Sequence, residues 1–284
     1  MTLLFAVIRA LHFASLMTAF GASALLSQTA IKIDLRKPLI VAAGVALATA
    51  VLCLCFATAE MTGDPDAFYD VQSLSIIATQ TFYGQVFFLR LLLLIGLGLV
   101  SLGDRAHIFK AAIAGTALAL LGLTSHAAAA GPPQYEYVRA GIDALHLVAA
   151  GFWVGGLAVL APEVLAKPRD TARLVALLRL FSRWGVVSVA VLLIAGTANA
   201  VLILDTHGMA WNNTYVTLLA IKIVLAALMV ALALTNRFSV LPALARGDQE
   251  ASDTIPLTVL AELGAALLIL AIVGFLGLTA PMQM

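Results

Sequence analysis

Two histidines occupy matching positions in a sequence pattern that occurs twice along the chain. The segment IRALH of residues 8–12 recurs as IDALH in residues 142–146, and a glycine follows each histidine nine residues later, at Gly21 and Gly155. A neutral imidazole is a ligand for copper and other first-row transition metals. Because an ionisable side chain inside a membrane span is costly, its presence there indicates a functional site. The duplication of His12 and His146 predicts that this site lies between two halves of the chain.

A second repeated pattern places one cation in each half of the chain. Tyr83 and Arg90 match Tyr215 and Lys222, and each cation follows its tyrosine by seven residues. Seven residues of helix advance about 10 Å, so both cations are expected inside the membrane. They either extend back toward the interface or turn inward, where they close a polar network or bind an anionic group.

Histidines and methionines gather where the sequence predicts the outer half of the membrane. We predict that His12, His146 and His126 form the metal site. Auxiliary metal ligands, or positions where the metal enters, are predicted at Glu60, Met61, His207 and Met209. A thioether favours Cu(I), whereas imidazole suits both oxidation states. Each residue also has a structural interpretation, the histidines as interhelical hydrogen-bonding contacts and the methionines as apolar filling.

Charged residues next to the histidines are candidates for orienting them. Asp143 precedes His146 by three residues and shares its helical face, so its carboxylate could fix the imidazole tautomer. Arg9 stands at the equivalent position before His12. An Arg9–Asp143 pair, a local Arg139–Asp143 pair and simple interfacial anchoring all remain open.

Small and apolar residues surround the second histidine. Residues 151–156 (GFWVGG) contain a small-xxx-small pattern, which allows a neighbouring helix to approach closely. Trp153 within it is a candidate wall of the histidine pocket. Cys53 and Cys55 lie about 200° apart around a helix, so apolar filling is their expected role, with one as an auxiliary Cu(I) ligand the alternative.

The elements that carry these residues are membrane helices. The chain is 62% hydrophobic and 11% charged, with a mean hydropathy of +1.05, whereas about a quarter of the residues of a soluble protein are charged. Spans of about 20 apolar residues are predicted at 3–28, 38–59, 82–102, 108–128, 139–163, 180–204, 214–236 and 255–279. The first is expected to be a span and not a cleaved signal, because Arg9 and His12 interrupt it.

Charge placement predicts the topology. Most of the 16 lysines and arginines fall in the connections after the first, third, fifth and seventh spans, so these loops should be cytoplasmic and both termini outside, in the periplasm. The fold class is therefore an all-α polytopic membrane protein of eight helices, arranged as a parallel 4+4 internal repeat. It forms a single transmembrane domain, 1–284, with halves at about 1–130 and 135–284.

Residues 144–157 (ALHLVAAGFWVGGL) resemble the signature of the bacterial copper-resistance D family (CopD/PcoD). Tyr215 with Lys222, residues 236–237 (NR), residues 241–244 (LPAL) and residues 125–128 (SHAA) also agree with that family. The resemblance implies eight spans, a multi-pass location in the bacterial inner membrane and a role in copper handling. It also implies a periplasmic copper-binding partner, the C protein of the same system.

The sequence supports three functions. The preferred one is copper transport or uptake, in which outer residues collect copper and pass it to the histidine site. An alternative is a membrane redox protein in which the two histidines ligate haem b and Arg90 or Lys222 binds its propionates. The third is a copper receptor or assembly factor that does not transport. Apart from the haem alternative no enzyme activity is expected, and no nucleotide or nucleic-acid site is indicated. Transport direction, copper oxidation state and oligomeric state stay open.

Overall fold

The computed structural model describes residues 2–103, 106–124, 133–207 and 214–278, and every secondary-structure element in these ranges is a helix. Eight of the described helical segments are long and apolar enough to cross a membrane. They are α1 (Thr2–Leu26), α2 (Arg36–Thr62), α4 (Phe82–Ser101), α5 (His107–Ala119, continued by a 3₁₀ turn to Thr124), α7 (Glu136–Leu165), α8 (Thr171–His207), α9 (Thr214–Thr235, continued to Ala245) and α11 (Gln249–Leu276). This confirms the predicted all-helical class and the eight helices of membrane-spanning length.

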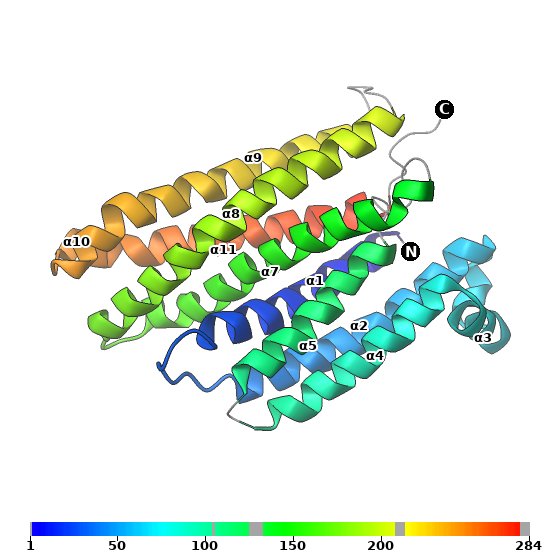
Figure 1. The fold of residues 1–284 in the computed structure, drawn as a ribbon, viewed down its shortest axis with the longest axis horizontal. Helices are drawn as coiled ribbons and strands as arrows, with labels where there is room; N and C mark the ends of the chain where they lie inside the picture. The colour runs from blue at the N-terminus through cyan, green and yellow to red at the C-terminus, as the bar shows by residue number, and fades with distance from the viewer. Residues whose placement is uncertain (1, 104–105, 125–132, 208–213, 279–284) are drawn as a thin grey trace.

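Helices α1 and α7 form the centre of the bundle. Of all helix pairs they pack most closely, and α1 also contacts α2, α5 and α11, while α7 contacts α8, α11 and α5. Figure 1 shows α8 and α9 along one edge of the bundle and α2 and α4 along the other. The two repeated histidines therefore lie on the two central helices, each next to a different edge.

Glycines allow the backbones of α1 and α7 to touch. A Cβ atom built at Gly155 would lie 2.5 Å from the carbonyl oxygen of Met17 and 2.6 Å from the Cα atom of Gly21. A Cβ atom at Gly21 would meet the Gly151 carbonyl oxygen. Gly21, Gly151 and Gly155 thus allow a close contact between the two helices, as the sequence indicates.

Two spans differ in extent from the apolar runs that predict them. Helix α8 begins at Thr171, not at 180, and its first turn is stabilised by Asp170, whose carboxylate accepts the Arg173 backbone N–H at 3.0 Å. Helix α9 continues through a π-helical turn, Asn236–Val240, into the short helix α10 (Leu241–Ala245). Hydropathy locates only the apolar part of a helix, whereas capping and side-chain packing carry the helix beyond it.

A short helix, α3 (Val71–Gln80), lies in a region that the hydropathy pattern leaves as a loop. Asp70 caps it by accepting the backbone N–H groups of Gln72 and Ser73, at 3.3 and 2.9 Å. Hydrogen bonds from the Ser73 hydroxyl, and then from these two backbone N–H groups, lower the pKa of the exposed Asp70 carboxyl. The helix contacts α2 and α4 at one end of the bundle.

The two ends of the bundle differ in the connections they hold. The start of α1, the end of α11 and α3 lie at one end, which we call the terminal end (Figure 1). The connections after α1, α4, α7 and α10 lie at the other, which we call the basic end because most lysines and arginines gather there. That the terminal end faces the periplasm stays a prediction from charge placement.

Candidate functional site

His12 is buried on α1 and faces α2 and α4. Its side chain is 3% exposed, and its Nδ1 lies 2.9 Å from the Thr49 hydroxyl on α2. That hydroxyl donates its own hydrogen to the Val45 carbonyl oxygen at 2.6 Å, so it accepts from His12. Because Nδ1 then carries the proton, Nε2 holds the free lone pair of a neutral imidazole.

Arg90 on α4 occupies the lone pair of His12. Its guanidinium donates to His12 Nε2, and its side chain is only 6% exposed. Tyr83 and Cys53 lie within range of electrostatic interaction with Arg90. Of the two interpretations that the sequence allows for this cation, the structure shows the inward one. We call His12, Thr49, Arg90, Tyr83 and Cys53 the N-half cluster.

His146 on α7 faces α8 and α9. Its ring lies against the α8 backbone, because a Cβ atom at Gly196 would be only 3.2 Å from the ring Cε1 and 3.3 Å from Nδ1. Within the described part of the chain, the buried Nδ1 atom has no hydrogen-bond partner. Lys222 on α9 lies within electrostatic range of the imidazole. His146 and Lys222 are thus neighbours, as are their counterparts His12 and Arg90.

Asp143, one helical turn before His146, interacts with residues of α8 and α9. Its Oδ1 accepts a hydrogen bond from Asn199 Nδ2 at 3.1 Å, and it interacts electrostatically with Lys222 and Tyr215. We call His146, Lys222, Asp143, Asn199 and Tyr215 the C-half cluster. Arg9, the counterpart of Asp143, lies within electrostatic range of His12 and Arg90, with its guanidinium over the Phe5 ring and against Gly277 at the end of α11.

The two histidines thus belong to separate clusters, which corrects the prediction of one site between the halves. The cause lies in the repeated spacing. Nine residues of helix turn about 900°, which places each glycine on the side of the helix opposite its histidine. Gly21 and Gly155 face each other where α1 meets α7, so His12 and His146 point away from that contact, each into its own half.

Trp153, which the sequence predicts as a wall of the histidine pocket, contacts a carboxyl group that the sequence analysis missed. Its indole Nε1 donates to Glu262 Oε2 on α11 at 3.2 Å. Asn236 Nδ2 donates to the other oxygen, Oε1, at 2.7 Å. A glutamate inside an apolar span is itself a signal of a functional position, and that rule would have identified Glu262.

Of the other predicted metal positions, Glu60 lies within electrostatic range of Tyr83 in the N-half cluster, and three cannot be placed. Glu60 and Met61 are exposed at the last turns of α2, where Met61 is 54% exposed. His126 and Met209 lie outside the described residues, as does the side chain of His207, the last residue of α8. Within the described ranges, no three His, Cys, Asp or Glu side chains are grouped as a metal site requires.

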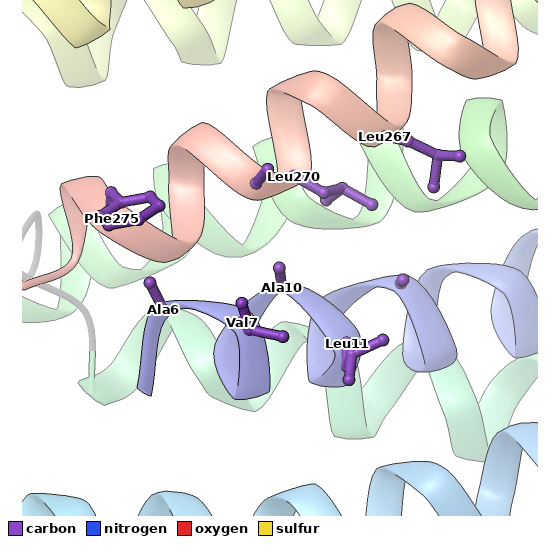
Figure 2. A pocket seen from close by; sticks show the side chains of 9 residues that line it. Ala6, Val7, Ala10, Leu11, Leu267, Leu270 and Phe275 are labelled. Carbon is purple, nitrogen blue, oxygen red and sulfur yellow. The ribbon is translucent and has the colours of Figure 1, made fainter. Parts of the chain in front are cut away.

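A groove between α1 and α11 is apolar and opens beside exposed leucines. Figure 2 shows it lined by Ala6, Val7, Ala10 and Leu11 on α1 and by Leu267, Leu270 and Phe275 on α11. These side chains carry no nitrogen, oxygen or sulfur atom that could bind a metal. The groove therefore offers no ligand for a metal ion.

The fold and the clusters define a multi-pass helical membrane protein with buried histidine–cation pairs. A family model described as copper resistance protein D-like, N-terminal domain, matches residues 1–135, and one described as copper resistance protein D matches residues 175–276. Copper resistance protein D of Pseudomonas syringae pv. tomato is 30% identical over 264 residues, which cover 86% of this chain and 84% of that relative. The chain therefore belongs to the copper resistance protein D family, whose name points to copper handling. No solved structure matches it.

Proposed function

We propose that this protein carries copper across the bacterial inner membrane, with the N-half and C-half clusters as two binding positions. The observation that carries the proposal is the state of His12. Thr49 holds the proton on Nδ1, so that Nε2 presents a lone pair inside the membrane. A hydrogen bond to the non-ligating nitrogen is the usual way in which proteins orient a metal-binding histidine.

The two buried cations suit passage better than storage. Arg90 satisfies the His12 lone pair when copper is absent, and its charge repels a copper ion that takes its place. Lys222 lies within electrostatic range of His146, so its charge likewise opposes a copper ion at that position. A site that contains a fixed positive charge binds the ion weakly enough to release it.

The terminal end supplies copper in this proposal. Glu60 and Met61 are exposed there, and the thioether of Met61 suits Cu(I) while the carboxylate attracts cations. The donor would be a periplasmic copper-binding protein of the C type. The haem alternative is less well supported, because two histidines that face different helices do not converge on one iron.

Copper flux into liposomes tests the proposal. Reconstituted wild-type protein should raise copper inside vesicles loaded with a copper-sensitive dye. The His12→Ala/His146→Ala double variant should reduce flux at least about tenfold, the scale on which metal sites respond to the loss of a supporting contact. His107→Ala is the matched control, because His107 begins α5 at the basic end, apart from both clusters.

Two outcomes would contradict transport. Copper that binds to the vesicles without reaching the lumen would indicate a receptor or assembly factor. A haem absorption band in the purified protein that the double variant lacks would establish the redox alternative.

A further inference from the structure

Glu262 is a buried carboxyl group that copper handling at the two clusters does not use. It lies on α11 and is 1% exposed. Its two oxygens accept hydrogen bonds from Trp153 on α7 and Asn236 in the π-helical turn, at 3.2 and 2.7 Å. Two other elements, α7 and the π-helical turn, therefore donate to one carboxyl group of α11 inside the membrane region.

The groups around Glu262 are held so that they donate to it. The Thr258 hydroxyl donates to Asn236 Oδ1 at 2.6 Å, which leaves the amide nitrogen of Asn236 facing the carboxyl. An indole nitrogen is a donor only. Asn236 is the first residue of the π-helical turn Asn236–Val240, and such turns occur frequently at functional sites.

No cation is paired with Glu262 among the described residues. Its interactions are with the neutral Trp153 and Asn236 alone. Arg237, the next residue after Asn236, is directed to α8, where it donates to the Ser182 hydroxyl and carbonyl at 2.7 and 2.9 Å. Two further arginines contact α11 away from Glu262: Arg169 donates to Ser252 near the start of the helix, and Arg9 of α1 lies beside Gly277 at its far end.

This environment suits a proton and not a metal ion. A metal ion needs several acceptor atoms around it, whereas the neighbours of Glu262 present N–H donors. A proton needs only one lone pair of the carboxylate, and its binding removes a buried charge that neutral donors alone compensate poorly. Protonation forms one O–H bond on Glu262, changes its charge from −1 to zero and requires no electron transfer.

The position of Glu262 places it between the C-half cluster and the basic end. It lies 13 residues, about 20 Å, from the start of α11 at that end. Trp153 lies seven residues beyond His146 on nearly the same face of α7, about 10 Å closer to the basic end. We propose that Glu262 is a proton-binding site inside the membrane.

Trp153 provides a direct reporter of this proton. The chain has three tryptophans, so Trp184→Phe/Trp211→Phe leaves Trp153 alone in the full-length protein. We expect its fluorescence in detergent, without copper, to change as the pH is varied from about 5 to about 9, the range in which buried carboxyl groups titrate. Glu262→Gln should abolish the change, because the amide keeps the shape of the side chain and cannot ionise. Glu250→Gln, an exposed change at the start of α11, should leave it intact.

Infrared spectroscopy gives a second reading of the same group. The C=O stretch of a protonated carboxylic acid should lose intensity as the pH rises in wild type, and this loss should be absent in Glu262→Gln. A fluorescence titration that persists in Glu262→Gln, or no titration of either signal in wild type, would overturn the proton site.

A coupling of this proton to copper rests on the proposed function and is tested separately. In liposomes that hold a pH-sensitive dye, copper added to wild type should change the internal pH, and Glu262→Gln should lose that change. If wild type moves no copper, the transport proposal fails, while the Trp153 titration still decides whether Glu262 binds a proton.

Discussion

At the residue scale, each repeated histidine is accompanied by a buried cation. Arg90 donates to His12, and Lys222 lies within electrostatic range of His146. A neutral imidazole next to a fixed positive charge is unusual for a storage site, because the charge opposes the metal. Two predictions follow from this local chemistry, one for the cation and one for the hydroxyl on the other side of the ring.

Removal of the Arg90 charge should strengthen copper binding and slow its release. Arg90→Met keeps an apolar stem of similar length and removes the repulsion, so copper affinity should rise at least about tenfold, or about 1.4 kcal/mol. Competition with a copper chelator measures the affinity, and Arg90→Met/His12→Ala should cancel the gain. An affinity that falls in the single variant would show that Arg90 supports the ligand and does not compete with copper.

Loss of the Thr49 hydroxyl should remove the hydrogen bond that orients the His12 ring. Thr49→Val leaves the buried Nδ1–H without its acceptor, which should cost about 1–3 kcal/mol of stability and reduce copper retention at least about tenfold. Thermal unfolding in detergent and metal content check both effects. Thr58→Val is the matched control, because the buried Thr58 hydroxyl donates only to the Leu54 carbonyl of its own helix; equal losses in both variants would reject the special role of Thr49.

At the element scale, the contact between α1 and α7 decides where the histidines point. Gly21 and Gly155 allow the two backbones to touch, and the nine-residue spacing then turns each histidine away from this contact. The helices α2 and α4 complete the N-half cluster by packing against each other, whereas the described residues of α8 and α9 make few close contacts with each other. The C-half cluster is therefore less enclosed than the N-half cluster.

Filling the contact between α1 and α7 should destabilise the bundle. The Cβ atom of Gly155→Ala would lie 2.5–2.7 Å from backbone atoms of Met17, Gly21 and Ala22, and backbone atoms cannot move aside as a side chain would. The expected cost is about 1–3 kcal/mol, measured by thermal unfolding in detergent. Gly44→Ala on α2, where no atom lies within 4 Å of the added methyl group, should be neutral or stabilising; a similar loss there would show that the contact between α1 and α7 is not the cause.

At the scale of the whole molecule, each half of the chain contains one cluster, and the two clusters share a histidine, a buried cation and a tyrosine. His12 and Arg90 hold on α1 and α4 the places that His146 and Lys222 hold on α7 and α9. Figure 1 places α2 and α4 at the opposite edge of the bundle from α8 and α9. The two clusters should therefore act as independent positions for copper.

Copper stoichiometry tests this independence. His12→Ala and His146→Ala should each remove about half of the copper that wild type retains, and the double variant about all of it, because effects at separated sites add. Metal analysis of purified protein measures this. Loss of nearly all copper in either single variant would restore the single shared site that the repeat alone suggests.

The sequence by itself determined the class of this protein and most of its helices. Apolar runs of about 20 residues require helices in a membrane, because hydrocarbon leaves backbone groups no other partner. The repeated pattern identified His12, His146, Arg90 and Lys222, and the tertiary structure places each histidine beside its matching cation. Pattern matching could do this because equivalent residues in a repeat tend to occupy equivalent surroundings.

Only the tertiary structure decided which helices these residues face. Hydropathy gives no information on how a helix is rotated about its axis, and that rotation depends on packing between distant segments, here the glycine contact of α1 with α7. Packing between distant segments also brings Trp153 to Glu262, which lies 109 residues further along the chain. Asn236 reaches the same carboxyl group from a third segment. A carboxyl group within a hydrophobic run is visible in the sequence, but its donors are supplied by other helices and so become known only when the bundle is assembled.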